Sequence, residues 1–442
     1  MKQQHKLSIK EKICYGLGDS SANIFLGMTM MFLPYFYTDV LGISAAAMGI
    51  LFIVARLVDA FYDPFIGNIS DRTRTQLCCY CLFLLVWALH CVFPFFLFFV
   101  APVFPPTGNL VYAVFPFLFL LVFVPPGVVP YVALLTTPTA DPMDRLSANS
   151  WRFPLAKMAF LICSMVVPIF VAWYGETDEA RAYMMAMSFI AVLATAFMLL
   201  CFWGTKERYQ VSVETDKVPF TKQLGIMLKA KPVVVFYLFK ITSSIAFVIK
   251  GSVTIYFVKY FLNRGDGFVS GLLSATAIAG IIAPMIAIQL IKRNKLSKLG
   301  TLKVAQLGGG VAALCLYFVN PEQISLACVL LVLSVLMAEL GSITAWALPS
   351  DCADYCEDKS GVRMSGAVAA GTLFSMKVGL ALAGGVGGVV VSPCGFKTGE
   401  AGAFGKTAAG IFFFFRGSSP FLAIIFWGSV MFFIVCLIVD WE

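Results

Sequence analysis

Two carboxylates and one guanidinium lie within an apolar stretch of the sequence, where each charge is energetically costly. Arg56, Asp59 and Asp63 are spaced by three and four residues, so on a helix they share one face. A charge at the middle of a bilayer costs from about 3 to more than 10 kcal/mol, and such residues usually face a protein interior or a water-filled cavity. A carboxylate pair there can bind a monovalent cation such as Na⁺ or exchange a proton. We therefore predict that Asp59 and Asp63 form the cation-coupling site, with Arg56 as a substrate ligand or as their counter-ion.

A second apolar stretch supplies a candidate for the balancing charge. Lys377 lies far inside residues 364–391 and needs an acidic partner there. The two carboxylates exceed Arg56 by one charge, so they are the expected partners. A neighbouring lysine competes electrostatically with the cation, which makes cation occupancy depend on conformation.

The amino-acid composition indicates that these residues lie in a membrane protein. The 442 residues are 60% hydrophobic and 13% charged, and the mean hydropathy of +0.88 is far above that of a soluble domain. We predict an all-α integral membrane protein of twelve transmembrane helices in two six-helix bundles, residues 1–203 and 233–442, joined by a polar cytoplasmic linker, residues 204–232. Windows of roughly 20 apolar residues are placed near 22–38, 45–69, 77–100, 110–135, 153–173, 183–203, 233–261, 267–290, 301–319, 324–348, 364–391 and 421–439.

The distribution of lysine and arginine predicts the orientation. These residues concentrate at the N-terminus and in alternate loops, and short cytoplasmic loops retain them. Both termini are therefore expected to be cytoplasmic. The same retention explains the net charge of +8, so no nucleic-acid partner is expected. No removable signal peptide is evident at the lysine-bearing N-terminus.

Other polar residues in the apolar windows are candidates for lining a cavity. Arg152 either points inward or lies at the cytoplasmic interface. Lys240, Lys250 and Lys259 share one window; Lys240 is expected to reach the inner interface and Lys259 the outer one. Lys250 then faces a cavity or forms a structural ion pair. A run of prolines between Pro116 and Pro130 predicts a broken or kinked helix.

Charged residues at two helix ends are candidates for gating. Asp71, Arg72 and Arg74 follow the helix that carries the carboxylate pair, and they suit either a charge-locked hinge or a simple cytoplasmic anchor. In the second half, the corresponding gating candidates are Asp351, Asp354 and Arg363. Asp141, Asp144 and Arg145 are expected in a loop.

No constellation for covalent chemistry or a resident cofactor is evident. The thirteen cysteines lie mostly in apolar windows, without metal-ligand spacing. We find no P-loop, zinc-protease helix or nucleophile elbow, so the chain is not expected to be an enzyme or to carry a cofactor.

Several motifs together resemble the glycoside-pentoside-hexuronide:cation symporters of the major facilitator superfamily. The similarity runs from about residue 8 to the end of the chain. The motifs that carry it are Tyr15-Gly16-Leu17-Gly18-Asp19, Phe36-Tyr37-Thr38-Asp39, Ala55-Arg56 with Asp59-Ala60 and Asp63-Pro64, Asp71-Arg72-Thr73-Arg74, Ser150-Trp151-Arg152, Thr205-Lys206-Glu207-Arg208-Tyr209, Tyr256-Phe257-Val258-Lys259-Tyr260, and Asp354-Tyr355 with Ser360-Gly361-Val362-Arg363 and Lys377.

The resemblance implies roles for individual residues. Asp59 and Asp63 are similar to the family's cation ligands, with Lys377 as the neighbouring base. Arg152 resembles the substrate-side arginine and Trp346 a sugar-stacking residue; the remaining substrate-binding candidates are Asn23, Tyr131, Arg56 and Lys250. The melibiose-transporting member of the family carries aspartates at the positions of Asn23 and Val128, so melibiose itself is not the expected substrate.

The resemblance implies a monomeric symporter in the cell inner membrane that imports a glycoside, pentoside or hexuronide with H⁺ or Na⁺. Two alternatives stay open: a lysolipid:cation symporter, and a transport-deficient membrane sensor of the same fold. The sensor is suggested by the segment after Arg74, which reads Gln76-Leu77-Cys78-Cys79-Tyr80-Cys81 where the family usually has a basic Gly-Lys-Phe-Arg-Pro run.

Overall fold

The computed structural model describes residues 6–391, with gaps at 74–79, 91–95, 98, 100–105, 140, 175–177, 209–217, 257, 259–261, 263, 265 and 363. Within these residues the chain is helical and contains no strand. The elements are α1 (Ile9–Tyr35), η1 (Phe36–Val40), α2 (Ala45–Arg72), α3 (Cys81–His90), α5 (Pro106–Phe123), α6 (Pro125–Leu134), α7 (Pro142–Tyr174), α8 (Glu179–Gly204), α9 (Phe220–Lys229), α10 (Lys231–Tyr256), α11 (Asp266–Lys292), α12 (Lys298–Cys315), η4 (Leu316–Phe318), α13 (Ile324–Ala345), α14 (Leu348–Ser360) and α15 (Ser365–Val391).

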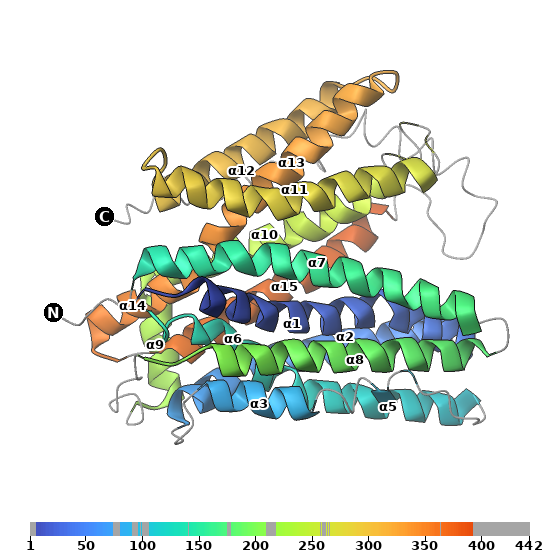
Figure 1. The fold of residues 1–442 in the computed structure, drawn as a ribbon, viewed down its shortest axis with the longest axis horizontal. Coiled ribbons are helices and arrows are strands. Elements are labelled where there is room, and N and C mark those ends of the chain that lie inside the picture. Colours follow the sequence, from blue (N-terminus) through green and yellow to red (C-terminus); the bar gives the residue numbers. More distant parts are fainter. Residues whose placement is uncertain are drawn as a thin grey trace. The chain divides into compact units, whose positions relative to one another are not determined.

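The chain divides into two compact units. Unit 1 comprises Met1–Ala230 together with Ala347–Phe374, and unit 2 comprises Lys231–Trp346 and the chain from Ser375 onward. In unit 1, α1 packs against α7 and α8, and α3 packs against α6 and α8 (Figure 1). In unit 2, α13 packs against α11 and α12. The predicted last span, 421–439, lies outside the described residues.

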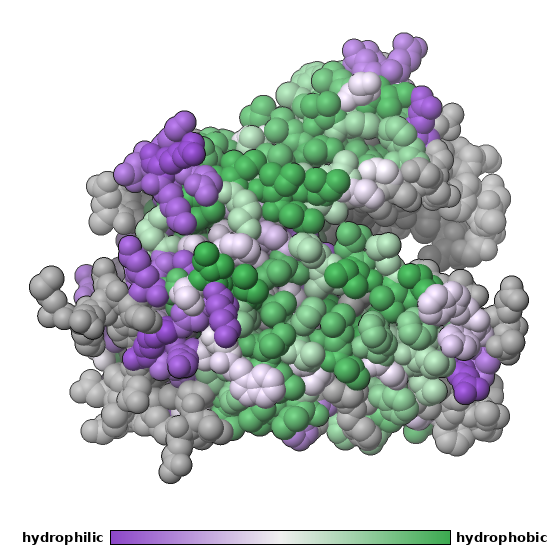
Figure 2. Space-filling view, viewed as in Figure 1, coloured by the Kyte–Doolittle hydropathy of each residue, from purple (hydrophilic) through white to green (hydrophobic). Residues whose placement is uncertain are grey.

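Apolar side chains lie on the outer surface of these helices as well as between them. On the visible face of unit 1, hydrophobic residues extend along α7 and α8, and hydrophilic residues gather near the helix ends (Figure 2). Large exposed side chains of α7 and α8 include Leu161, Met165, Trp173, Val192 and Trp203. Within the described part of the chain, four helical stretches are long and apolar enough to cross a bilayer: Ala180–Gly204, Ser274–Lys292, Ile324–Ser360 and Ser365–Leu382. An apolar exterior is what a lipid-facing surface requires.

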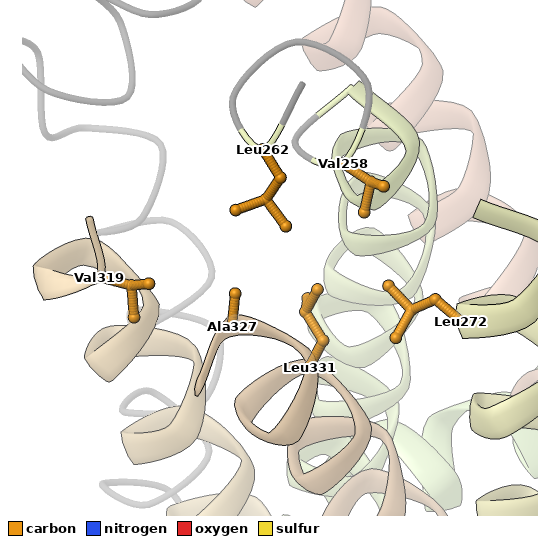
Figure 3. Packing of buried hydrophobic residues seen from close by; sticks show 6 residues of the cluster. All are labelled: Val258, Leu262, Leu272, Val319, Ala327 and Leu331. Atoms are coloured by element: carbon orange, nitrogen blue, oxygen red, sulfur yellow. The ribbon is translucent and has the colours of Figure 1, made fainter. Parts of the chain in front are cut away.

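A small hydrophobic cluster lies at one end of the helices of unit 2. Leu272 of α11 and the first turns of α13 meet the segment that follows α10 (Figure 3). The buried residues of the cluster are Val258, Leu262, Leu272, Val319, Ala327 and Leu331.

Proline sets the break between α5 and α6, as predicted. α5 ends at Phe123 and α6 begins at Pro125, with Pro126 next. Proline lacks the N–H that a helix interior requires, and Pro125 and Pro126 remove two such donors in succession. The helix therefore ends and restarts, which positions Tyr131 one and a half turns into α6.

Several predicted boundaries were wrong because hydropathy marks the apolar core of a helix and not its ends. α1 begins at Ile9, where Ser8 and Glu11 form a capping box. α7 begins at Pro142, so Asp144 and Arg145 lie in its first turn and not in a loop. The segment predicted as a linker contains α9, and the polar residues after Trp346 form α14.

Candidate functional site

The carboxylate of Asp63 is fully buried within α2. Its exposed fraction is 0%, although α2 also carries exposed apolar residues such as Val58 and Phe61. Asp59 and Arg56 lie on the same helix, one and two turns earlier, but their side chains are outside the described residues. A helix face with Asp63 in the interior is the arrangement expected of a functional acid, because ionising a buried carboxylate requires a compensating group.

A buried ion pair lies in the interior of unit 1. A guanidinium nitrogen of Arg152, on α7, lies 2.6 Å from a carboxylate oxygen of Asp19, on α1. Both residues are at least nine-tenths buried, with exposed fractions of 4% and 5%. Arg152 therefore points inward, which decides between the two alternatives open for it. The sequence pattern did not pair Arg152 with Asp19, although an acid within an apolar helix is itself a signal of pairing.

Aromatic side chains surround this ion pair. The rings of Tyr15 and Tyr131 stack with centroids 4.9 Å apart, and the Arg152 guanidinium carbon lies 5.4 Å from the Tyr131 centroid. The Tyr131 hydroxyl donates to the carbonyl oxygen of Tyr15 at 2.8 Å. Gly18 permits this approach, because a Cβ there would lie 2.6 Å from the Tyr131 ring.

Asn23 lies at the edge of the same group. Its side-chain amide donates to the carbonyl oxygen of Asp19 at 2.9 Å, and the residue is exposed. The structure thus brings together three predicted substrate residues, Asn23, Tyr131 and Arg152. A carboxylate acceptor and a guanidinium donor side by side can bind the donor and acceptor functions of adjacent sugar hydroxyls.

A lysine and a tryptophan form the corresponding contact in unit 2. The ammonium of Lys240, on α10, lies 3.8 Å from the ring centroid of Trp346, at the C-terminus of α13. Lys240 is 5% exposed, so the prediction that it reaches the inner interface was wrong. Packing against Trp346 and Phe236, whose centroid is 5.7 Å away, provides a cation–π environment in place of water.

Two other lysines with predicted roles are Lys250 and Lys377. Lys250 lies on α10, but its side chain is outside the described residues. Lys377 lies on α15 and is half-buried. Two residues further on, Gly379 allows a close approach to α10, because a Cβ there would lie 2.8 Å from the Ser244 Cβ.

Asp71 caps the N-terminus of α15. Its carboxylate accepts from the backbone amides of Gly366 at 2.6 Å and Ala367 at 2.9 Å, and from the Tyr80 hydroxyl at 2.6 Å. The amides at a helix N-terminus and the helix dipole both favour a negative charge. Asp71 is therefore held by backbone amides, and its neighbour Arg72 donates instead to the Val218 carbonyl at 2.7 Å. Arg74 is outside the described residues.

A second polar link joins α7 to α14. Arg145 forms an ion pair with Asp354, and its Nε donates to the Thr139 carbonyl at 3.0 Å. The Arg145 side chain is 3% exposed and that of Asp354 is 43% exposed. Asp351 lies one turn before Asp354 and is half-buried; Arg363 is outside the described residues.

The residues after α8 bind back onto unit 1. Glu207 accepts from the backbone amides of Tyr80 at 2.7 Å and Cys81 at 3.0 Å, at the start of α3. Arg208 forms an ion pair with Glu11. Burial alone would raise the pKa of Glu11, but hydrogen bonds from Ser8 and Arg208 bring this pKa below its usual value of 4.5.

Comparison with known proteins identifies the family. A family model described as MFS/sugar transport protein matches residues 14–437. The protein named "Putative glycoside/cation symporter YagG" of Escherichia coli (strain K12) is 33% identical over 391 residues, which cover 88% of this chain and 83% of that protein. The isoprimeverose transporter of Lactiplantibacillus pentosus is 29% identical over 408 residues, with 88% and 81% covered.

A solved structure shares the fold. The major facilitator superfamily transporter FucP, in its outward conformation, matches with a TM-score of 0.66 at 13% identity, covering 96% of this chain and 98% of FucP. At this identity the likeness concerns the fold alone, which is the all-helical transporter fold. The helical architecture and the match of the sugar-transport model over nearly the whole chain lead to one conclusion: this chain belongs to the glycoside-pentoside-hexuronide:cation symporter family of the major facilitator superfamily.

Proposed function

We propose that this protein is a secondary active transporter that imports a glycoside, pentoside or hexuronide by symport with H⁺ or Na⁺. The observation that carries the proposal is the complete burial of the Asp63 carboxylate in an apolar helix. A carboxylate there can bind a cation or a proton, and binding neutralises its charge for passage across the membrane. The setting is the cell inner membrane, and the working unit is the monomer.

The cation site is built on α2. Asp59 lies one helical turn before Asp63, on the same face. Pro64 lies inside α2 and has no N–H, so the carbonyl of Ala60 lacks its usual helical donor. Two carboxylates and this carbonyl supply the oxygen ligands that Na⁺ prefers. Lys377 is the proposed counter-charge when the site is empty.

Both units contain candidate substrate-binding groups. In unit 1, the Asp19–Arg152 pair offers an acceptor and donors for sugar hydroxyls beside the ring of Tyr131, and Asn23 adds a side-chain amide. In unit 2, Trp346 offers an aromatic face to the apolar side of a sugar ring. Arg56 and Lys250 remain further candidates for substrate ligands.

Alternating access follows from rocking of two halves around a central site. The cap of Asp71 on α15 and the Arg145–Asp354 ion pair are polar contacts at helix ends. Such contacts can break and re-form at modest cost, because each is replaceable by hydrogen bonds to water. Both contacts lie within unit 1 and join residues from the first and second halves of the sequence. They are the proposed gating contacts, with Arg72, Arg74, Asp351 and Arg363 nearby in sequence.

Uptake by proteoliposomes tests this proposal. Labelled glycosides, pentosides and uronides are supplied with an inward Na⁺ or H⁺ gradient. The wild type should accumulate one of them, and Asp59→Asn and Asp63→Asn should abolish accumulation. Glu322→Gln, which removes an exposed carboxylate, should transport normally.

Three results would contradict the proposal. Normal accumulation by both aspartate variants would remove the coupling site from α2. Transport of lysophospholipids without transport of any sugar would favour the lipid symporter. Saturable sugar binding without accumulation by the wild type would favour the membrane sensor.

A further inference from the structure

The short helix α9 lies between the two halves of the sequence and is anchored to unit 1. The Val218 carbonyl, just before α9, accepts from the Arg72 guanidinium at 2.7 Å and from the Gln223 side-chain amide at 3.2 Å. Gln223 and Met227, one turn apart, are 0% and 3% exposed. α9 also packs against α14 (Figure 1). One face of α9 is thus fixed on the protein, beside the end of α2.

The rest of α9 is exposed and amphipathic. Leu224 and Leu228 are 39% and 59% exposed, and a spacing of four residues places them on one flank of the helix. Lys222 and Lys229 are also exposed, and their spacing of seven residues places both on the opposite flank. The two exposed leucines therefore lie on one flank of α9 and the two exposed lysines on the other.

The surface of a bilayer suits both flanks of α9, because it offers acyl chains to the leucines and headgroups to the lysines. Bulk water suits only the lysine flank. A helix at the membrane surface buries its apolar side among the upper acyl chains, and its lysines extend toward anionic headgroups. α9 begins beside the end of α2, where Arg72 contacts the Val218 carbonyl, and the lysine and arginine distribution predicts that end to be cytoplasmic. Anionic lipids of that leaflet attract basic residues close to the surface. A soluble partner protein would not require apolar residues at the level of a transmembrane helix end.

The geometry points to α9 as a membrane-surface helix that binds the anionic phospholipids of the cytoplasmic leaflet. Leu224 and Leu228 insert between acyl chains, and Lys222 and Lys229 contact phosphate groups. Because Arg72 holds the start of α9 and Asp71 caps α15, lipid binding stabilises the segment next to a proposed gating contact. The inference requires only that the chain is a membrane protein, and it stands independently of the transported substrate.

Hydrogen–deuterium exchange of the full-length protein in nanodiscs tests the inference. One set of discs contains phosphatidylcholine alone, and the other includes about 30% phosphatidylglycerol. Amides of residues 220–229 should exchange about tenfold more slowly in the anionic discs, since two lysines each gain an attraction to the surface. Lys222→Gln/Lys229→Gln should lose this difference. Lys292→Gln/Lys295→Gln removes the same charge from another exposed site and should keep it.

A second variant and an internal reference separate lipid binding from misfolding. Leu224→Asn/Leu228→Asn should raise α9 exchange in both kinds of disc, while exchange of α14 stays unchanged in every variant. Equal protection of wild-type α9 in neutral and anionic discs would overturn the inference, because packing of α9 on unit 1 would then suffice. Protection that appears only after addition of a cytosolic extract would overturn it in favour of a protein partner.

Discussion

The Asp71 carboxylate accepts a hydrogen bond from the Gly366 backbone amide at 2.6 Å, which places a negative charge at the first turn of α15. The two residues are 295 positions apart in the chain. A Cβ at Gly366 would lie 2.6 Å from the same carboxylate oxygen, so only glycine permits this approach. The contact combines a charged acceptor with the helix dipole, and its strength depends on the charge.

Replacing that charge should weaken the cap. Asp71→Asn keeps the shape of the side chain but replaces the carboxylate with a neutral amide, and we expect a loss of about 1–2 kcal/mol of stability. Thermal unfolding of the purified protein in detergent measures this loss. Asp178→Asn changes an exposed N-cap of α8 and should cost less than half as much. Equal shifts for both variants would mean that the Asp71 cap has no special role.

Removing one member of the buried Asp19–Arg152 pair should be more harmful than removing both. Asp19→Asn leaves a buried guanidinium without its carboxylate, and such a loss costs about 3–5 kcal/mol. In a double-mutant cycle, Asp19→Ala and Arg152→Ala should show a coupling energy above about 1 kcal/mol. Unfolding midpoints of the four proteins in the cycle measure the coupling, and additive effects would contradict a direct pair.

Arg152→Lys provides a separate test of geometry. The variant retains the charge but loses the planar fork of the guanidinium. Stability should therefore fall less than in Asp19→Asn, while the KM for uptake should rise severalfold if the fork binds substrate. An unchanged KM would limit Arg152 to a structural role.

The contact between Lys240 and Trp346 should require a positive charge at position 240, which either lysine or arginine can supply. Lys240→Met retains an apolar stem but removes the cation–π attraction, which is worth about 0.5–2 kcal/mol. We expect a lower unfolding midpoint and a higher KM for uptake, because the ring of Trp346 is no longer held. Lys240→Arg should restore most of both properties. Failure of arginine to rescue them would show that volume, not charge, matters at this position.

The pairing of Glu11 with Arg208 and Ser8 predicts an acid-sensitive contribution to stability. The pKa of Glu11 is lowered from 4.5 in the folded protein, so the folded state binds the proton less tightly than the unfolded state does. The contribution is therefore fully present above pH 4.5 and is lost as the pH falls through the lowered pKa. Unfolding midpoints recorded from neutral pH to below pH 4.5 should decline less steeply for Glu11→Gln than for the wild type. Parallel curves would contradict this assignment.

Local patterns in the sequence predicted much of the helical architecture. The window 364–391 coincides closely with α15, and 267–290 lies within α11. Proline correctly marked the break before α6, and the placement of Asp63 on an apolar helix anticipated its burial. These features depend on residues that are neighbours in the chain, where periodicity and backbone chemistry act directly. Helix ends were less predictable, because polar capping residues such as Ser8 extend a helix beyond its apolar core.

Contacts between helices were decided by the tertiary structure. The sequence alone identified Arg152 and Asp71 as charges of interest, but it placed neither Asp19 beside the first nor Gly366 beside the second. These partners are separated by 133 and 295 residues. Lys240 was expected at an interface, and packing instead buried it against Trp346. Hydropathy and spacing determine which helices form and which face is polar, whereas the partner of each polar group depends on how side-chain shapes from distant helices fit together.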